Sequence, residues 1–163
     1  MSNTSSQSTN RGKEATMHRE IAKGVYYVGV DDHHTELFEN LWKLPFGVSY
    51  NSYLIVDDKI AVVETVKAPW ADEWLNNISE IVDPSKIDYI ILNHMEPDHT
   101  GSLPDLSKIV PNATIIYTPF ASKLRYSFYD VPNPEKQVED LEELSGKLLS
   151  DPGAVDYLLL NRG

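Results

Sequence analysis

The chain has 163 residues, 41% of them hydrophobic, which is enough for one domain with a packed core. Its formal net charge of -11 excludes most nucleic-acid binders, because phosphate binding depends on clustered Lys and Arg. The absence of cysteine excludes disulfides, thiolate zinc sites and iron–sulfur clusters, and it fits a cytoplasmic protein. We predict no membrane span, since apolar runs such as Tyr89 to Leu92 are short. Residues 1–17 lack the apolar segment of a signal peptide and are predicted to be a disordered tail.

The hydrophobic pattern predicts strands that first form hairpins and then alternate with helices. Predicted strands span residues 24–30, 48–56, 60–66, 87–92 and 113–118, with the turn Asp57-Asp58-Lys59 joining the second to the third. Predicted helices span residues 69–82, 103–110, 119–129 and 138–149. The first of these helices is predicted from an apolar stripe at helical spacing, formed by Trp70, Trp74, Ile78 and Ile81. This order predicts a mixed α/β layered domain over residues 18–163, diverging after about residue 130.

Four side chains that can bind a metal lie within six residues, directly after the strand predicted at 87–92. They are His94, Glu96, Asp98 and His99. Alternate residues of an extended backbone share a face, so His94 and Glu96 can point the same way. Pro97 then turns the chain, which lets Asp98 and His99 reach a second position close by. The spacing therefore predicts two adjacent metal positions.

The ligand types indicate which metal the loop prefers. A site that mixes histidine with carboxylates suits iron or manganese redox chemistry better than a zinc hydrolase. A purely structural interpretation is that Asp98 or Thr100 caps the following helix. The two interpretations are compatible, and the density of ligands favours a metal site.

The segment His94-Met95-Glu96-Pro97-Asp98-His99 resembles the metal-binding loop of the flavodiiron proteins. These proteins carry glutamate in place of the second histidine of the His-x-His-x-Asp-His loop of the metallo-β-lactamase superfamily. The flanking segments Gly47 to Ile55 and Thr100 to Pro104 are similar to the family's as well. The resemblance runs from about His18 to Tyr129.

This resemblance implies the N-terminal part of an αββα metallo-β-lactamase-like sandwich, incomplete and without a flavodoxin domain. It implies a non-heme diiron centre that reduces oxygen or nitric oxide in an electron-transport reaction. His94 and Glu96 would bind one iron, and Asp98 the other, with His99 as a further ligand of that second iron. The family supplies two further histidines and a bridging aspartate downstream of this loop, but none of the five histidines of this chain follows His99. Asp151 is a weak candidate for the bridging aspartate.

Cofactor and partner expectations follow from the same resemblance. No phosphate-binding loop for FMN follows any predicted strand, so FMN is expected only if a partner chain supplies it. A flavoprotein or a rubredoxin-like protein is the expected electron donor. An incomplete sandwich exposes apolar sheet edges, which predicts a homo-oligomer or a partner-dependent fold.

Three functions from different classes remain open. The first is a flavodiiron-type oxidoreductase domain that is not catalytic alone, so no catalytic or cofactor-binding side chain is assigned. The second is a sensor or binding module for oxygen or iron. The third is a zinc hydrolase, which Glu96 and the missing histidines disfavour. His33 and His34 could fill vacant ligand positions, although an exposed turn is the favoured interpretation for both.

Overall fold

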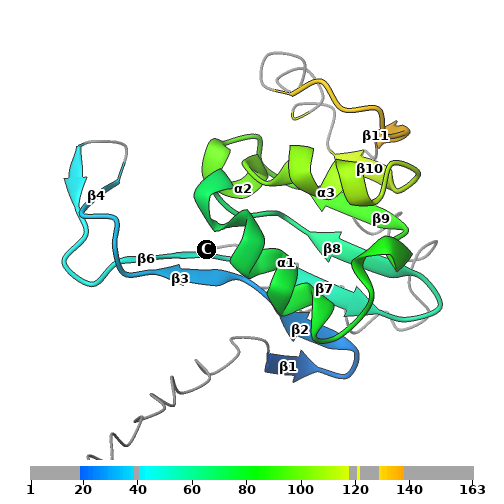
Figure 1. Cartoon of the computed structure of the whole chain (residues 1–163), viewed down its shortest axis with the longest axis horizontal. Helices are drawn as coiled ribbons and strands as arrows, with labels where there is room; N and C mark the ends of the chain where they lie inside the picture. The colour runs from blue at the N-terminus through cyan, green and yellow to red at the C-terminus, as the bar shows by residue number, and fades with distance from the viewer. Residues whose placement is uncertain (1–18, 39–40, 118–120, 122–128, 138–163) are drawn as a thin grey trace, which may run out of the picture.

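A seven-stranded mixed sheet forms the centre of the protein (Figure 1). The computed structural model describes residues 19–38, 41–117, 121 and 129–137. In sheet order the strands are β1 (Arg19–Ala22), β2 (Val25–Tyr27), β7 (Tyr53–Val56), β8 (Ile60–Val63), β9 (Tyr89–Leu92), β10 (Thr114–Tyr117) and β11 (Glu135–Gln137). Pairing is antiparallel from β1 to β8 and parallel from β8 to β11. The predicted mixed α/β class is confirmed.

Two helices pack on one face of this sheet. Helix α1 (Ala71–Ser79) continues the turn η1 (Ala68–Trp70), and α3 (Leu103–Ile109) follows the short α2 (Pro97–Thr100), while η2 (Pro84–Lys86) precedes β9. Trp74 and Leu106 are fully buried in the larger core cluster, together with strand residues such as Ile90. A smaller cluster around Ile91 lies on the opposite face, because neighbouring strand residues point to opposite sides. In the described part of the chain this is one helical layer on one sheet.

Two of the predicted strands leave the main sheet together. The strand predicted at 24–30 divides into β2 and β3 (Val30–Asp32), and that at 48–56 into β6 (Val48–Tyr50) and β7. At the break the Val28 N–H donates to the Ser52 carbonyl at 2.9 Å. Gly29 fits there because an added Cβ would lie 2.3 Å from the Tyr50 carbonyl oxygen. Beyond the break β3 pairs with β6 instead of with the main sheet.

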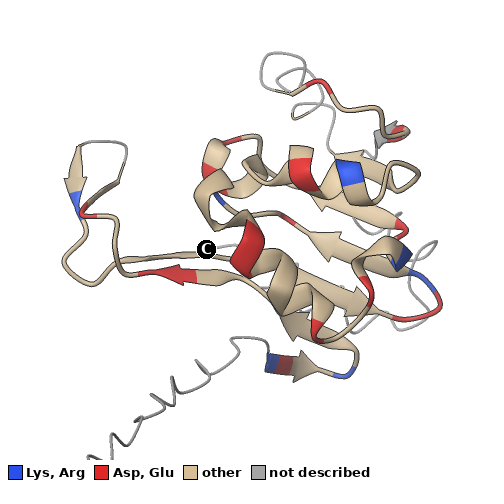
Figure 2. Ribbon diagram, viewed as in Figure 1, with Lys and Arg blue, Asp and Glu red and all other residues tan. Residues whose placement is uncertain are grey.

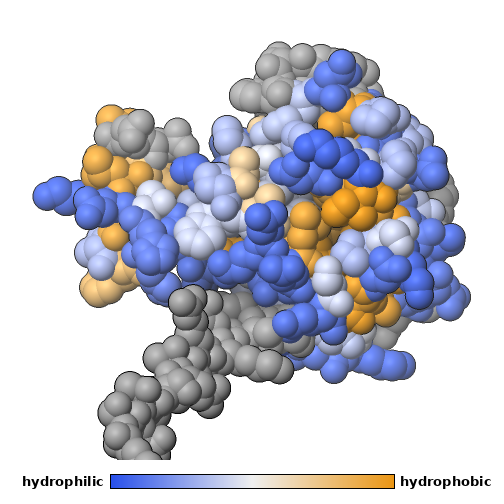
Figure 3. All heavy atoms as spheres, in the orientation of Figure 1, coloured by the Kyte–Doolittle hydropathy of each residue, from blue (hydrophilic) through white to orange (hydrophobic). Residues whose placement is uncertain are grey.

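A small hairpin projects from the end of this β3–β6 ribbon (Figure 1). It consists of β4 (Leu37–Phe38) and β5 (Trp42–Lys43). Leu41, Trp42 and nearby Phe46 are largely exposed, and Phe46 retains 89% of its accessible surface. Figure 3 shows apolar surface gathered over this projection.

Most of the other predicted strands and helices are present in the described residues. The strands at 60–66, 87–92 and 113–118 appear as β8, β9 and β10, and the helix at 103–110 as α3. The helix at 69–82 appears as η1 and α1. Strands β1, β4, β5 and β11 and the short helices η2 and α2 were not predicted. The tail at 1–17 and the helices at 119–129 and 138–149 lie outside the described residues, apart from Ala121 and Tyr129. No helix among the described residues is long and apolar enough to cross a membrane.

Candidate metal centre

The loop with the predicted ligands follows β9 at the carboxyl end of the parallel strands. Met95 is buried, whereas His94 and Glu96 on either side of it are more accessible. Because of this alternation, the buried Met95 side chain anchors the loop in the core, and the His94 and Glu96 side chains lie on the outer face. Pro97 then begins α2, a position that suits proline because no N–H is required there. The turn of α2 brings Asp98 and His99 back toward the loop.

The ligand atoms form two overlapping groups. Glu64, His94 and His99 make one group, and Glu96, Asp98 and His99 make the other, with the ligand atoms of each within 4.8 Å of one another. The His94 and His99 rings lie with their centroids 5.0 Å apart. His99 belongs to both groups, so the four predicted ligands are close together. The division that pairs His94 with Glu96 on one iron stays a prediction.

Glu64 is the residue that sequence reasoning missed. It follows β8 directly and is buried, with a left-handed backbone at φ +58°. Its Oε1 accepts a hydrogen bond from the Asn93 N–H at 2.8 Å, whereas its buried Oε2 has no hydrogen-bond partner. Burial raises the pKa of Glu64 to about 8. The signal in the sequence was a single carboxylate within the mostly apolar segment Ile60 to Val66.

The segment after β8 also holds α2 in place. The Thr65 N–H and hydroxyl both donate to the His99 carbonyl, at 2.7 and 2.9 Å. The Ser102 N–H and hydroxyl both donate to the Val66 carbonyl at 2.9 Å. Gly101 permits this close approach, since an added Cβ would lie 2.6 Å from the Ala68 nitrogen. The ligand loop is therefore clamped at its carboxyl end by backbone contacts.

The expected helix caps are not formed. The N-cap residue of α3 is Ser102, which makes no side-chain capping bond. The Thr100 hydroxyl instead donates back to the Glu96 carbonyl at 3.0 Å. The interpretation of Asp98 or Thr100 as the cap of the following helix is therefore wrong, because both residues lie inside the preceding turn of α2.

A buried aspartate organises the wall next to the ligand loop. Asp32 accepts hydrogen bonds from the His34 and Thr35 N–H groups at 2.8 and 2.9 Å. It also accepts from the Thr35 and Tyr50 hydroxyls and from the Trp70 indole N–H. Burial alone would raise the pKa of Asp32, but these donors outweigh it and lower the pKa to about 2. Burial, then the hydrogen bond to Asp32 and the negative charges of Asp32 and Asp98, raise the pKa of Tyr50 to about 12. The wall adjoins the ligand loop because Trp70 belongs to η1, whose Ala68 lies against Gly101 at the end of α2.

The two histidines of the predicted turn lie on this wall. The His34 ring stacks on Trp70 with centroids 6.0 Å apart. His33 is exposed, with Nδ1 3.3 Å from the Phe46 carbonyl oxygen. Among the described residues neither histidine belongs to a ligand group.

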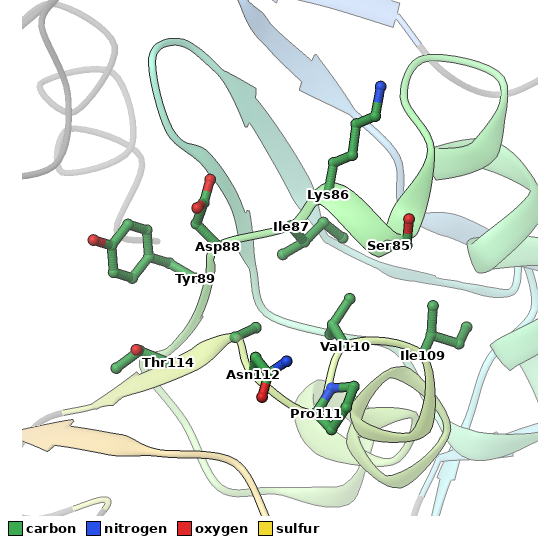
Figure 4. A pocket seen from close by; sticks show the side chains of 11 residues that line it. Ser85, Lys86, Ile87, Asp88, Tyr89, Ile109, Val110, Pro111, Asn112 and Thr114 are labelled. Atoms are coloured by element: carbon green, nitrogen blue, oxygen red, sulfur yellow. The ribbon is translucent and has the colours of Figure 1, made fainter.

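A polar pocket of about 550 Å³ lies at the other end of β9 (Figure 4). Asp88, Tyr89 and Thr114, at the starts of β9 and β10, line it with residues from the turn before β10. It contains no histidine, and Asp88 is already paired with Lys59 at 2.8 Å. Figure 2 shows Lys and Arg scattered singly in this view rather than gathered on one face. Among the described residues, none that lines this pocket belongs to a candidate metal-binding group, so the candidate chemistry lies at the ligand loop.

Comparisons with known proteins identify the family and the fold of this chain. A protein-family model described as ODP family beta lactamase matches residues 48–153. A nitric oxide reductase of Moorella thermoacetica is 39% identical over 114 residues, covering 68% of this chain and 29% of that protein. A rubredoxin-oxygen oxidoreductase of Megalodesulfovibrio gigas is 34% identical over 126 residues, covering 77% and 31%. The crystal structure of the flavodiiron protein from Giardia intestinalis superposes with a TM-score of 0.71 at 32% identity, covering 80% of this chain and 32% of that one. The chain thus spans about three tenths of the length of these relatives.

Proposed function

Because the chain belongs to the ODP family of beta-lactamase-like proteins and is related to flavodiiron nitric oxide and oxygen reductases, we propose that its loop from His94 to His99 binds non-heme iron. The observation that carries the proposal is the ligand group of Glu96, Asp98 and His99, whose ligand atoms lie within 4.8 Å of one another, with the His94 ring 5.0 Å from the His99 ring.

The residues present fit such a metal. The donors are imidazoles and carboxylates without thiolate, a set that suits iron or manganese. His94, Glu96, Asp98 and His99 would hold the iron. Bound iron would supply one-electron chemistry and an open position for a diatomic gas.

The protein framework contributes placement rather than chemistry. Buried Met95 anchors the loop from within, and the Thr65 contacts to the His99 carbonyl fix its far end. Ligands fixed in this way lose little freedom when a metal binds.

Substrate and partners complete the proposal. We propose oxygen or nitric oxide as the substrate, and a rubredoxin-like protein or a flavoprotein as the electron donor. FMN would come from a partner chain, in a cytoplasmic setting. The loop supplies only part of a diiron ligand set, so turnover of substrate would require further ligands from outside the loop. A sensor that binds oxygen or iron without reducing it is the alternative.

Anaerobic titration with ferrous iron tests this proposal, with elemental analysis after desalting. We expect weak binding of fewer than two irons per chain, abolished by His94→Ala and by Asp98→Ala. The matched control is His33→Ala, an exposed histidine outside both ligand groups, which should bind iron like the wild type. Iron binding that His94→Ala leaves unchanged would refute the proposed site.

The same protein separates the competing functions. Oxygen or nitric oxide consumption with a chemical reductant supports the oxidoreductase function, whereas iron binding without consumption supports the sensor. Preferential loading of zinc with ester or lactam hydrolysis would instead establish a hydrolase.

A further inference from the structure

His99 presents its two ring nitrogens to two different carboxylates. Its Nε2 lies 3.8 Å from Asp98 Oδ2, on the side of the acidic ligand group with Glu96. Its Nδ1 lies 3.7 Å from Glu64 Oε2, on the buried side. The Nε2 side of the ring therefore faces the accessible carboxylates of the loop, and the Nδ1 side faces the buried Glu64 carboxyl group.

A neutral imidazole has one nitrogen that carries a proton and one that carries a free lone pair. Binding a metal through Nε2 therefore requires the proton on Nδ1. Which tautomer forms is set by the hydrogen bond that the other nitrogen makes. An acceptor for the Nδ1 proton decides whether His99 can be a ligand on the open side.

The Glu64 carboxylate, in its ionised form, presents Oε2 as that acceptor. Both Glu64 Oε2 and His99 Nδ1 are fully buried, and neither has a hydrogen-bond partner. A contraction of their 3.7 Å separation by about half an ångström would form a hydrogen bond. Leaving both atoms unpaired is costly inside a protein, which favours that contraction.

Glu64 is itself rigidly held. Its N–H donates to the Ile91 carbonyl at 2.8 Å, and its carbonyl accepts from the Ser52 hydroxyl at 3.0 Å. The Trp74 indole N–H in turn donates to Ser52 Oγ at 2.9 Å. With Oε1 bound to the Asn93 N–H, only Oε2 is available to His99.

We propose that Glu64 is a positioning residue that accepts a hydrogen bond from His99 Nδ1–H and so directs His99 Nε2 to the metal. This inference rests on the proposed function of the loop as a metal site. Direct ligation by Glu64 is disfavoured, because an ion between Oε2 and Nδ1 would lie among fully buried atoms with no open position for a substrate.

Nitrogen-15 NMR of histidine-labelled protein tests the proposal, with Zn(II) as a diamagnetic stand-in for iron. Long-range proton–nitrogen correlations distinguish metal-bound, protonated and free ring nitrogens. We expect His99 to bind zinc through Nε2 and to carry its proton on Nδ1. Zinc bound through Nδ1, with the proton on Nε2, would overturn the inference while leaving the metal site intact.

Glu64→Gln supplies the matched perturbation. Its amide oxygen can still accept from the Asn93 N–H, while its amide NH₂ faces Nδ1 and opposes the Nδ1–H tautomer. We expect zinc affinity to fall about 10- to 100-fold, together with loss of the Nδ1–H signal. Glu73→Gln makes the same charge change on the exposed face of α1 and should change neither. A Glu64→Gln protein with wild-type affinity and tautomer would contradict the proposal.

Measurements on the metal-free protein separate the proposed metal site from the proposed role of Glu64. If the wild type binds neither iron nor zinc, the proposed function fails, and the His99 tautomer of the metal-free protein still decides the role of Glu64. At pH 9 we expect Nδ1–H in the wild type and Nε2–H in Glu64→Gln. If Glu64→Gln does not fold, the wild-type tautomer is sufficient by itself, since Nδ1–H supports the proposal and Nε2–H overturns it.

Discussion

Replacing Asp32 with asparagine keeps the shape of the side chain and removes its charge from the wall beside the ligand loop. The pKa of Asp32 is lowered from 3.8 to about 2, and each pH unit corresponds to about 1.4 kcal/mol, so ionisation stabilises the fold by about 2 kcal/mol at neutral pH. The asparagine NH₂ would also meet donors such as the Tyr50 hydroxyl and the Trp70 indole N–H. We therefore expect Asp32→Asn to lose about 2–4 kcal/mol of unfolding free energy at pH 7.

The pH dependence of this loss gives a sharper test than its size. A depressed folded-state pKa contributes stability that is full above the unfolded value of 3.8 and is lost as the pH falls through about 2. The difference between wild type and Asp32→Asn should therefore narrow between pH 7 and pH 2.5 in urea unfolding followed by fluorescence. Asp31→Asn is the control, since Asp31 accepts one described hydrogen bond, from Ser49, at an exposed site. A difference that is equal at both pH values, or below about 0.5 kcal/mol at pH 7, would refute the reasoning.

Three further substitutions probe the clamp, the core and the hairpin, and one measurement concerns flavin. Gly101→Ala should cost more than about 2 kcal/mol in urea unfolding, since its Cβ would meet the Ala68 nitrogen at 2.6 Å; a near-neutral result would contradict the close approach. Trp74→Phe should cost about 1–3 kcal/mol, because the Ser52 hydroxyl loses its buried donor, and a thermal melt would detect this. Phe46→Ser should change unfolding by no more than about 0.5 kcal/mol yet reduce self-association in sedimentation equilibrium; unchanged association would exclude the hairpin as its cause. The purified chain should show no flavin absorbance, and a stoichiometric flavin spectrum would contradict this expectation.

Periodicity predicts the elements whose partners lie on both sides of them. Strands β8, β9 and β10 are continuous apolar runs because parallel central strands are buried on both faces, and all three were predicted. The break at Gly29 was not predictable in this way. This break requires two strands that are distant in sequence to change pairing partners at the same point. The hydrogen bond from Val28 to Ser52 joins the two strands there. Local pattern carries no information on such a joint change of pairing.

In the candidate site too, residues that are close in sequence were predicted and the distant one was not. The four ligands of the loop are close in sequence, so their spacing was enough to bring them together as candidates. Glu64 is distant from the loop in sequence and looks like one polar residue in an apolar strand. Its position beside His99 follows from the register of β8 on β9, where Val63 pairs with Ile91. That register is a property of the sheet and not of either segment.

The left-handed backbone of Glu64 has an evolutionary consequence. At φ +58° glycine, asparagine or aspartate would fit the backbone more easily, while glutamate bears a local strain of about 1 kcal/mol. Substitution of Glu64 by glycine or asparagine would relieve this strain and remove the carboxylate. A lineage that no longer needed a metal at this loop should drift to glycine or asparagine here before the surrounding core changes. The identity of this one residue in related sequences would then report whether selection still acts on the site.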